Sequence, residues 1–255
     1  MGNSTGRRRN GFDRPLSSSQ KSSWFLLILS IAISEAVYIP ALDRNRMIIF
    51  SFFYHTSLIS IGIFSFLATN KDPTLNPPNN TIDPIQNTRN AYCSLCKMQV
   101  YPNTKHCGQC NRCVDNFDHH CVWFNNCIGN INYKAFIIAI ASLLVNCLVI
   151  IGFGMFLIIK YFIDQKYIER QLSQTENLNA WFTLLIFLMI GAVVLTIIVG
   201  KLFILHLWLM NRNMRMFDYM LLKKKAKCKK VSANNTSIIS DNDSQEIPKK
   251  NLSFY

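Results

Sequence analysis

The chain has 255 residues, with 27 Lys and Arg against 14 Asp and Glu, so its formal net charge is +13. Only 16% of the residues are charged and 50% are hydrophobic, whereas soluble domains carry about 25% charged residues. This composition excludes an ordinary soluble enzyme and a disordered basic protein. It indicates a membrane protein whose charges lie outside its apolar spans. The cysteine count is odd, at nine, and seven lie between Cys93 and Cys127, which favours a local metal site over a disulfide framework.

Hydropathy divides the chain into five parts. Residues 1–21 are polar and basic, which predicts a disordered N-terminal arm. Apolar stretches at 22–42, 47–68, 135–159 and 180–200 are each long enough to cross a bilayer. We therefore predict transmembrane helices 1 and 2 within 22–68, a cysteine-rich domain at 69–134 and helices 3 and 4 within 135–210. The remaining residues, 211–255, form a basic tail that we expect to be mostly disordered. The first stretch could be a signal peptide, but its length and the lack of a small-residue cleavage pattern favour a retained helix.

Isolated polar residues within these stretches have alternative interpretations. Glu35 is the one charged residue of the first stretch, and we favour a position near the far interface over a functional role. His55 and Cys147 are interpreted as packing residues of the bundle. His206, just beyond the fourth stretch, is interpreted as a packed interfacial histidine.

Basic residues predict the orientation of the chain. They are concentrated in the arm, in 69–134 and in the tail, whereas the loops 43–46 and 160–179 are shorter and poorer in them. Because cytosolic segments are enriched in Lys and Arg, we expect both termini and the cysteine-rich domain in the cytosol. That compartment is reducing, so the cysteines should bind metal or remain free. The basic tail is predicted to contact anionic lipid rather than nucleic acid, and Cys228 within it is a candidate for S-acylation.

The cysteine-rich domain has the spacing of a zinc-binding module. The Cys-x2-Cys spacing occurs three times, beginning at Cys93, Cys107 and Cys110, and further cysteines and histidines lie around it. Zinc prefers four tetrahedral Cys and His ligands. Seven cysteines and three histidines lie between Cys93 and Cys127, which gives ten candidate ligands. Two zinc ions would use eight of them. One cysteine and one histidine remain, as a nucleophile and its base would require.

The residues Asp118-His119-His120-Cys121, followed by Trp123, Asn126-Cys127-x-Gly129, Asn132 and Phe136, carry a family resemblance. With four predicted spans around them, they resemble the DHHC family of protein S-acyltransferases, or palmitoyltransferases. The resemblance implies an all-α polytopic membrane protein with four transmembrane helices and a small zinc-bound cytosolic domain between helices 2 and 3. It also implies two structural Zn²⁺ ions, one held by Cys93, Cys96, His106 and Cys113, and the other by Cys107, Cys110, His120 and Cys127.

The same resemblance assigns the chemistry. Cys121 would be the nucleophile, His119 its base and Asp118 the residue that orients His119. The enzyme would move a long-chain acyl group from palmitoyl-CoA to cysteine thiols of membrane-associated proteins by a ping-pong reaction. By analogy, Trp123 and Asn146 would contact the acyl chain. We expect an endomembrane location (ER or Golgi), protein substrates with cytosolic juxtamembrane cysteines, contact with membrane lipid and no nucleic-acid partner.

Some positions depart from the family pattern. Thr74 replaces a glycine after Asp72-Pro73, Val122 replaces a proline after the motif cysteine, and the segment after helix 4 retains only Asp218 as a counterpart of its usual acid. These differences leave open a second hypothesis, a catalytically inactive, zinc-stabilised membrane adaptor. The sequence does not indicate the protein substrates, the preferred acyl length, the organelle or the oligomeric state.

Overall fold

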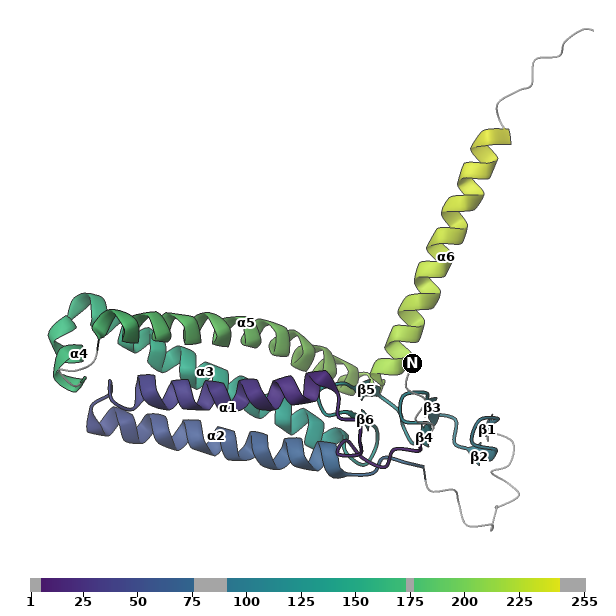
Figure 1. Cartoon of the computed structure of the whole chain (residues 1–255). Helices are drawn as coiled ribbons and strands as arrows, with labels where there is room; N and C mark the ends of the chain where they lie inside the picture. Colours follow the sequence, from purple (N-terminus) through teal and green to yellow (C-terminus); the bar gives the residue numbers. More distant parts are fainter. Residues whose placement is uncertain (1–5, 76–90, 173–176, 244–255) are drawn as a thin grey trace, which may run out of the picture.

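The protein is described by a computed structural model that covers residues 6–75, 91–172 and 177–243 (Figure 1). Four of its helices are long and apolar enough to cross a membrane, as predicted. The helices are α1 (Ser18–Tyr38), α2 (Arg44–Asn70), α3 (Tyr133–Ile163), α4 (Gln165–Gln171), α5 (Leu178–Asn211) and α6 (Met216–Asp243). The cysteine-rich segment lies between α2 and α3, so the predicted fold class is confirmed. α5 continues to Asn211, so residues 201–211 extend this helix beyond the predicted apolar stretch at 180–200.

The helix bundle is packed around aromatic side chains and small residues. The Tyr38 ring of α1 stacks on Phe50 of α2 with 4.8 Å between the ring centroids. Its hydroxyl donates a hydrogen bond of 2.8 Å to the carbonyl oxygen of Ile150 in α3. A Cβ atom at Gly154 would lie 2.1 Å from the sulfur of Met189, so glycine permits close contact between α3 and α5. These contacts fix the helices that carry the cysteine-rich segment.

Three two-stranded antiparallel hairpins form the described part of the cysteine-rich segment. Each strand has three residues: β1 (Ala91–Cys93), β2 (Met98–Val100), β3 (Lys105–Cys107), β4 (Arg112–Val114), β5 (His119–Cys121) and β6 (Asn126–Ile128). The sequence analysis did not predict these strands. Lys97, Asn111 and Asn125 adopt positive φ values in the hairpin turns, and asparagine tolerates this conformation better than most residues.

The prediction of a disordered N-terminal arm is wrong for the described residues of that arm. The backbone amide of Arg8 donates to the carbonyl oxygen of Cys110 (3.1 Å), and that of Gly11 donates to Thr69 (2.8 Å). The Gln20 side chain, in the first turn of α1, donates to the carbonyl oxygens of Gly11 and Phe124. The composition indicated an arm surrounded by solvent. These hydrogen bonds instead hold the described residues of the arm against the end of α2 and the cysteine-rich segment.

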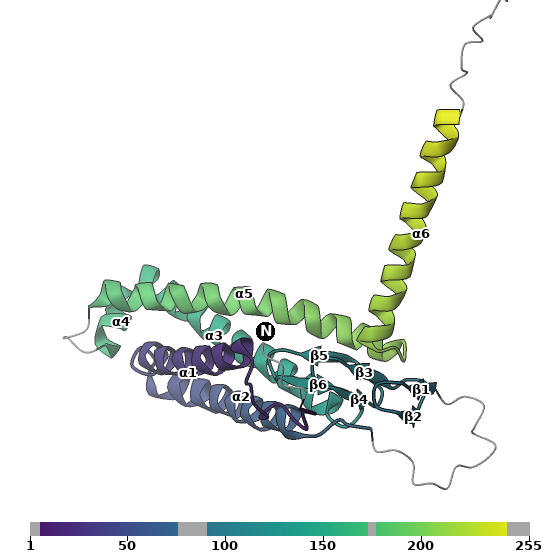
Figure 2. The same ribbon diagram turned by 45° about the vertical axis from the view of Figure 1, so that its right-hand side comes forward.

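The prediction of a mostly disordered tail is also wrong for residues 216–243, which form α6. Leucine, lysine and alanine in its first half favour a helix. Figures 1 and 2 show that α6 leaves the end of α5 and runs across the direction of the bundle. Residues 6–15, the hairpins and the start of α6 all lie at one end of the bundle, and α4 lies at the other. Residues 244–255 lie outside the described part of the tail.

Candidate active site and metal centres

Two clusters of four side chains have the composition of zinc sites. One contains Cys93, Cys96, His106 and Cys113, and the other contains Cys107, Cys110, His120 and Cys127. Within each cluster the candidate ligand atoms all lie within 4.8 Å of one another. The structure thus brings together the same two sets of residues that the family resemblance implied.

The hairpin geometry explains why the two sets alternate along the chain. Successive side chains of a strand point to opposite faces, so His106 and Cys107 of β3 join different clusters. His106 is paired across the hairpin with Cys113, and His120 is paired with Cys127. Each cluster therefore combines a Cys-x2-Cys turn from one hairpin with a cross-strand His–Cys pair from the next. The middle hairpin contributes to both clusters and links them.

The distances within the clusters fit a tetrahedral metal ion. The sulfur of Cys96 lies 3.3 Å from Nδ1 of His106, and the sulfur of Cys110 lies 3.3 Å from Nδ1 of His120. The sulfurs of Cys110 and Cys127 are 3.4 Å apart. Tetrahedral zinc with bonds of about 2.0–2.3 Å separates neighbouring ligand atoms by about 3.6 Å. Both donor sets are composed of soft sulfur and imidazole nitrogen and offer four ligands, which is typical of a closed structural site.

The remaining residues of the motif lie on the opposite face of β5. Because the side-chain period of a strand is two, His119 and Cys121 share the face that His120 does not use. Cys121 is buried, with 6% of its surface exposed, and it packs with Tyr133, Phe136 and other side chains of α3. The candidate nucleophile therefore lies where the cysteine-rich segment meets the ends of the apolar helices.

The side chains of Asp118, His119 and Cys121 form a hydrogen-bonded series. Nδ1 of His119 lies 2.7 Å from Oδ2 of Asp118, and the His119 imidazole also bonds to the Cys121 side chain. Burial alone would lower the pKa of His119, but the hydrogen bonds and negative charges of Asp118 and Cys121 outweigh it and raise the pKa to about 9. Burial similarly opposes ionisation of Asp118, yet its bonds from His119 and the Met216 amide hold its pKa below the usual value. Asp118 is therefore a carboxylate that supports a protonated His119.

Two partners of this series were not predicted from the sequence. The backbone amide of Met216, at the start of α6, donates a hydrogen bond of 3.0 Å to Oδ1 of Asp118. His206 of α5 is fully buried, and its Nδ1 lies 3.1 Å from the hydroxyl of Tyr133. A ring nitrogen of His206 also lies within 4.8 Å of Asp118 and His119. A backbone donor leaves no side-chain signature, and the position of His206 depends on how α5 packs against α3.

Two asparagines of the motif region connect the cysteine-rich segment to α2. The Asn126 side-chain amide donates to the carbonyl oxygens of Ala68, Thr69 and Lys71 at 2.9–3.0 Å. Asn132 donates to the carbonyl oxygens of Ala68 and Cys127. Carbonyls at the end of a helix lack partners within the helix, so these two amides both cap α2 and fix the hairpin β5–β6 against it.

Arg112 is a second connection between these parts. Its side chain is fully buried and donates to Asp72 at 2.9 Å and to Asn126 at 2.7 Å. It also bonds to the carbonyl oxygen of Arg9 in the N-terminal arm. Asp72 belongs to the Asp-Pro-Thr sequence after α2, and its carboxylate accepts bonds from the amide and hydroxyl of Thr74. The arm, α2 and the cysteine-rich segment therefore meet at one guanidinium group.

The other singled-out residues occupy different surroundings. Trp123 lies in the β5–β6 turn with 56% of its surface exposed, whereas Asn146 is buried in α3 and donates to the Ser57 hydroxyl at 2.8 Å. Their predicted contacts with an acyl chain stay a prediction. Asp218 is exposed in the first turn of α6, and the Met216 amide rather than Asp218 contacts Asp118. Cys228 is exposed on α6.

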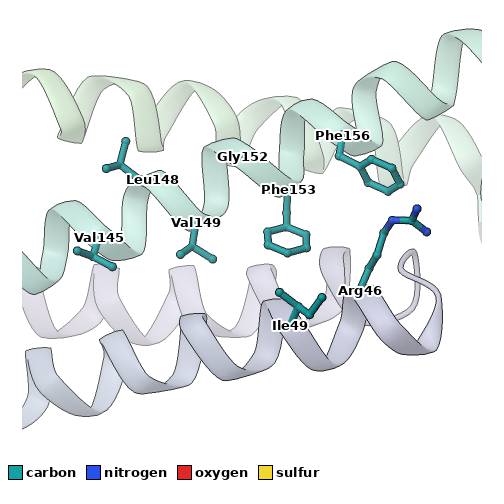
Figure 3. A pocket seen from close by; sticks show the side chains of 8 residues that line it. All are labelled: Arg46, Ile49, Val145, Leu148, Val149, Gly152, Phe153 and Phe156. Carbon is teal, nitrogen blue, oxygen red and sulfur yellow. The ribbon is translucent and has the colours of Figure 1, made fainter.

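A groove of about 570 Å³ lies between α2 and α3, and Figure 3 shows the side chains that line it. It extends along α3 from Val145 to Phe156 and is lined by apolar groups except for Arg46. The Arg46 guanidinium lies 4.7 Å from the centroid of the Phe156 ring and is paired with Asp43. Val145 is nine residues after Phe136, or about 14 Å along the helix, so the groove is separate from the Cys121 site.

Comparison with known proteins identifies similar sequences. Residues 86–223 match the model of the DHHC palmitoyltransferase family. Palmitoyltransferase ZDHHC11 of Mus musculus is 30% identical over 250 residues, which cover 84% of this chain and 70% of the relative. The Homo sapiens protein of the same name is 28% identical over 262 residues, covering 89% of this chain and 62% of the relative. Protein S-acyltransferase 18 of Arabidopsis thaliana is 37% identical over 148 residues, covering 56% of this chain and 29% of the relative. The chain thus spans less than two thirds of the human relative's length.

Proposed function

This chain belongs to the DHHC palmitoyltransferase family, and on that premise we propose that it is a protein S-acyltransferase that works through an acyl-Cys121 intermediate. The acyl donor is a long-chain acyl-CoA, palmitoyl-CoA in the simplest case. The acceptors are cysteine thiols of membrane-associated proteins. The observation that carries the proposal is the hydrogen-bonded series Asp118–His119–Cys121 at the end of the apolar bundle.

In the first half of the reaction, the Cys121 sulfur attacks the thioester carbonyl carbon of acyl-CoA. The thiolate is the nucleophilic form of cysteine, and its proton resides on His119. A bond forms between the Cys121 sulfur and the carbonyl carbon, and the bond from that carbon to the CoA sulfur breaks. CoA leaves as a thiol after His119 returns the proton to it. One thioester is thus exchanged for another, so the protein has to position groups and move one proton rather than supply a large driving force.

Asp118 keeps His119 ready for this proton transfer. Its carboxylate accepts the Nδ1–H of His119, which leaves Nε2 for Cys121, and its charge stabilises the imidazolium. The Met216 amide holds the second carboxylate oxygen, and His206 fills the space beside the pair. We regard Met216 and His206 as positioning residues. They supply contacts to Asp118 and His119 in a chain whose segment after α5 lacks the usual family signature.

In the second half, a substrate cysteine attacks acyl-Cys121. His119 takes the proton from the incoming thiol, a new thioester forms on the substrate, and the bond between the acyl carbon and the Cys121 sulfur breaks. The released Cys121 thiolate is the starting form of the enzyme. Only groups that reach the end of the bundle can enter, which favours cysteines close to a membrane surface.

The surroundings of Cys121 suit an acyl chain. Phe136 and Ile140 of α3 are buried beside Cys121, and Val199 and Leu202 of α5 pack against the same cluster. Asn146 lies 13 residues after Tyr133, about 20 Å along α3, a length comparable to that of a palmitoyl chain. An acyl chain attached to Cys121 would extend along these helices, with Trp123 near its thioester end and Asn146 near its methyl end.

The two Cys/His clusters would each hold a structural Zn²⁺, which crosslinks the hairpins and leaves no coordination position for substrate. The cysteine-rich segment has only short strands and little apolar core, so its fold depends on these crosslinks. Orientation follows from charge: the N-terminal arm, the hairpins and α6 face the cytosol, and the basic α6 contacts anionic lipid. An endomembrane location, ER or Golgi, remains part of the proposal.

The proposal is tested by labelling the purified full chain with radioactive palmitoyl-CoA and treating it with hydroxylamine, which cleaves thioesters. We expect hydroxylamine-sensitive label on the wild type and on Cys228→Ser, and none on Cys121→Ser, with zinc content unchanged in all three. Label that persists in Cys121→Ser and disappears in Cys228→Ser would make Cys228 a passive acceptor. Absence of label on the zinc-replete wild type would favour the inactive membrane adaptor.

A further inference from the structure

The side chains of Glu35 and His55 form a close acid–base contact within the membrane-spanning region. Nε2 of His55 lies 2.9 Å from Oε1 of Glu35, and Nδ1 of His55 lies 2.7 Å from the carbonyl oxygen of Ser51. The sequence analysis placed Glu35 near the far interface and treated His55 as a packing residue. The structure instead joins them as a bridge between α1 and α2.

The depth of this pair follows from helix geometry. His55 lies 11 residues from Arg44 and 15 from Asn70 at the ends of α2, or about 17 and 22 Å along the axis. α1 ends at Tyr38, which stacks on Phe50 rather than on the first turn of α2, so Glu35 lies a further turn inward. The hydrocarbon core of a bilayer is about 30 Å thick. The pair is therefore well inside it and not at an interface.

The pair is directed out of the bundle. The side chains of His55 and Glu35 have 48% and 36% of their surface exposed. α1 and α2 lie side by side along one edge of the bundle in both views (Figures 1 and 2). Within residues 6–75, 91–172 and 177–243, no element covers these exposed parts of the two side chains. Ionisable groups within a membrane normally face protein or water because lipid offers no hydrogen-bond partner.

We propose that Glu35 and His55 form the centre of a contact between two copies of this chain within the membrane. A surface with one acid and one base is complementary to itself, because a twofold rotation places the acid of each copy against the base of the other. Polar side chains that bond across helices drive such association in lipid.

The test compares dimer formation by the full chain in phosphatidylcholine liposomes over a range of protein-to-lipid ratios, measured by single-molecule photobleaching. Glu35→Leu/His55→Leu removes both partners and leaves no unpaired charge. We expect it to lower the association constant by at least about tenfold, since two symmetric contacts are lost. The matched control is Thr56→Val, an exposed polar residue of α2 whose hydroxyl bonds within its own helix to Phe52; it should dimerise as the wild type does.

Zinc content and the thermal midpoint verify that each variant is folded, so the test does not depend on acyl transfer. If the double variant does not fold, Glu35→Ala/His55→Ala, which also removes both polar partners but adds no larger apolar side chain, replaces it with the same expectation. A wild type that stays monomeric at every ratio, or a folded variant that dimerises as strongly as the wild type, would overturn the proposal.

Discussion

Asp118→Asn isolates the contribution of the carboxylate beside His119. In the wild type, the Met216 N–H donates a hydrogen bond of 3.0 Å to Oδ1 of Asp118. In the substituted chain, the same N–H keeps the amide oxygen of Asn at that position. The amide nitrogen must then face Nδ1 of His119, in place of the carboxylate oxygen at 2.7 Å. Two N–H groups cannot bond to each other, so Nδ1 has to become an acceptor and the proton moves to Nε2. His119 then offers Cys121 a donor where the reaction requires an acceptor.

The magnitude follows from two losses. A hydrogen bond to a charged group contributes about 1.5–3 kcal/mol, which corresponds to a rate reduction of about 10- to 150-fold. Fixing the wrong tautomer adds to this, and an equivalent change in a Ser-His-Asp triad costs about 10⁴-fold. We therefore expect acyl-enzyme formation to slow by between about 10² and 10⁴.

The assay is single-turnover acylation of the purified chain by labelled palmitoyl-CoA, with zinc content measured on the same samples. Asp115→Asn is the matched control, because Asp115 is also in the cysteine-rich segment and, among the described residues, its side chain bonds only to Asn116 and Asn130. It should acylate at the wild-type rate. If Asp118→Asn stays within threefold of the wild type, or loses its zinc, the assigned role of Asp118 is refuted.

Other predictions concern the connections that hold the site. Gly11→Ala places a Cβ atom 2.0 Å from the Phe124 carbonyl oxygen, so the arm has to move away. This displacement removes three hydrogen bonds at Gly11 and should lower the free energy of unfolding by about 3 kcal/mol, measured by thermal unfolding. Gly108→Ala is the control and should be neutral, because the added Cβ atom meets nothing within 4 Å. Arg112→Ala should destabilise the chain by about 2–4 kcal/mol, because it removes several hydrogen bonds of a fully buried guanidinium and leaves Oδ1 of the buried Asn126 unpaired. Arg112→Lys should recover only part of this, since one ammonium group cannot reach both Asp72 and Asn126; equal stability of the two variants would contradict this. Chelation of zinc should unfold the hairpins and stop acylation while the helical circular dichroism signal is retained, because the helices contain none of the candidate ligands; loss of that signal would show that the bundle depends on metal.

The sequence was informative where one local property decides the structure. Apolar runs of about 20 residues predicted the four spans, because a bilayer requires that length. The family resemblance implied the two ligand sets, and the structure gathers the same residues. By contrast, strands of three residues carry almost no propensity signal, since their pairing depends on the shared clusters more than on the residues themselves.

Long-range packing set the limits of prediction. Composition alone suggested that the N-terminal arm is disordered, because its backbone contacts with Thr69 and Cys110 have no side-chain pattern. The Met216 amide and His206 reach Asp118 and His119 only after α5 and α6 are positioned. The partner of Glu35 was also hidden, since His55 is 20 residues away and its relation to Glu35 depends on how far α1 extends along α2.

The most direct test of the account is a two-step transfer experiment. The chain is acylated with labelled palmitoyl-CoA, freed of CoA by gel filtration and then mixed with a cysteine-containing peptide bound to liposomes. The ping-pong mechanism predicts that label leaves Cys121, identified by peptide mass spectrometry, and appears on the peptide in equal amount without further acyl-CoA. Label that stays on the enzyme, or a peptide that is acylated only while acyl-CoA is present, would contradict an acyl-Cys121 intermediate.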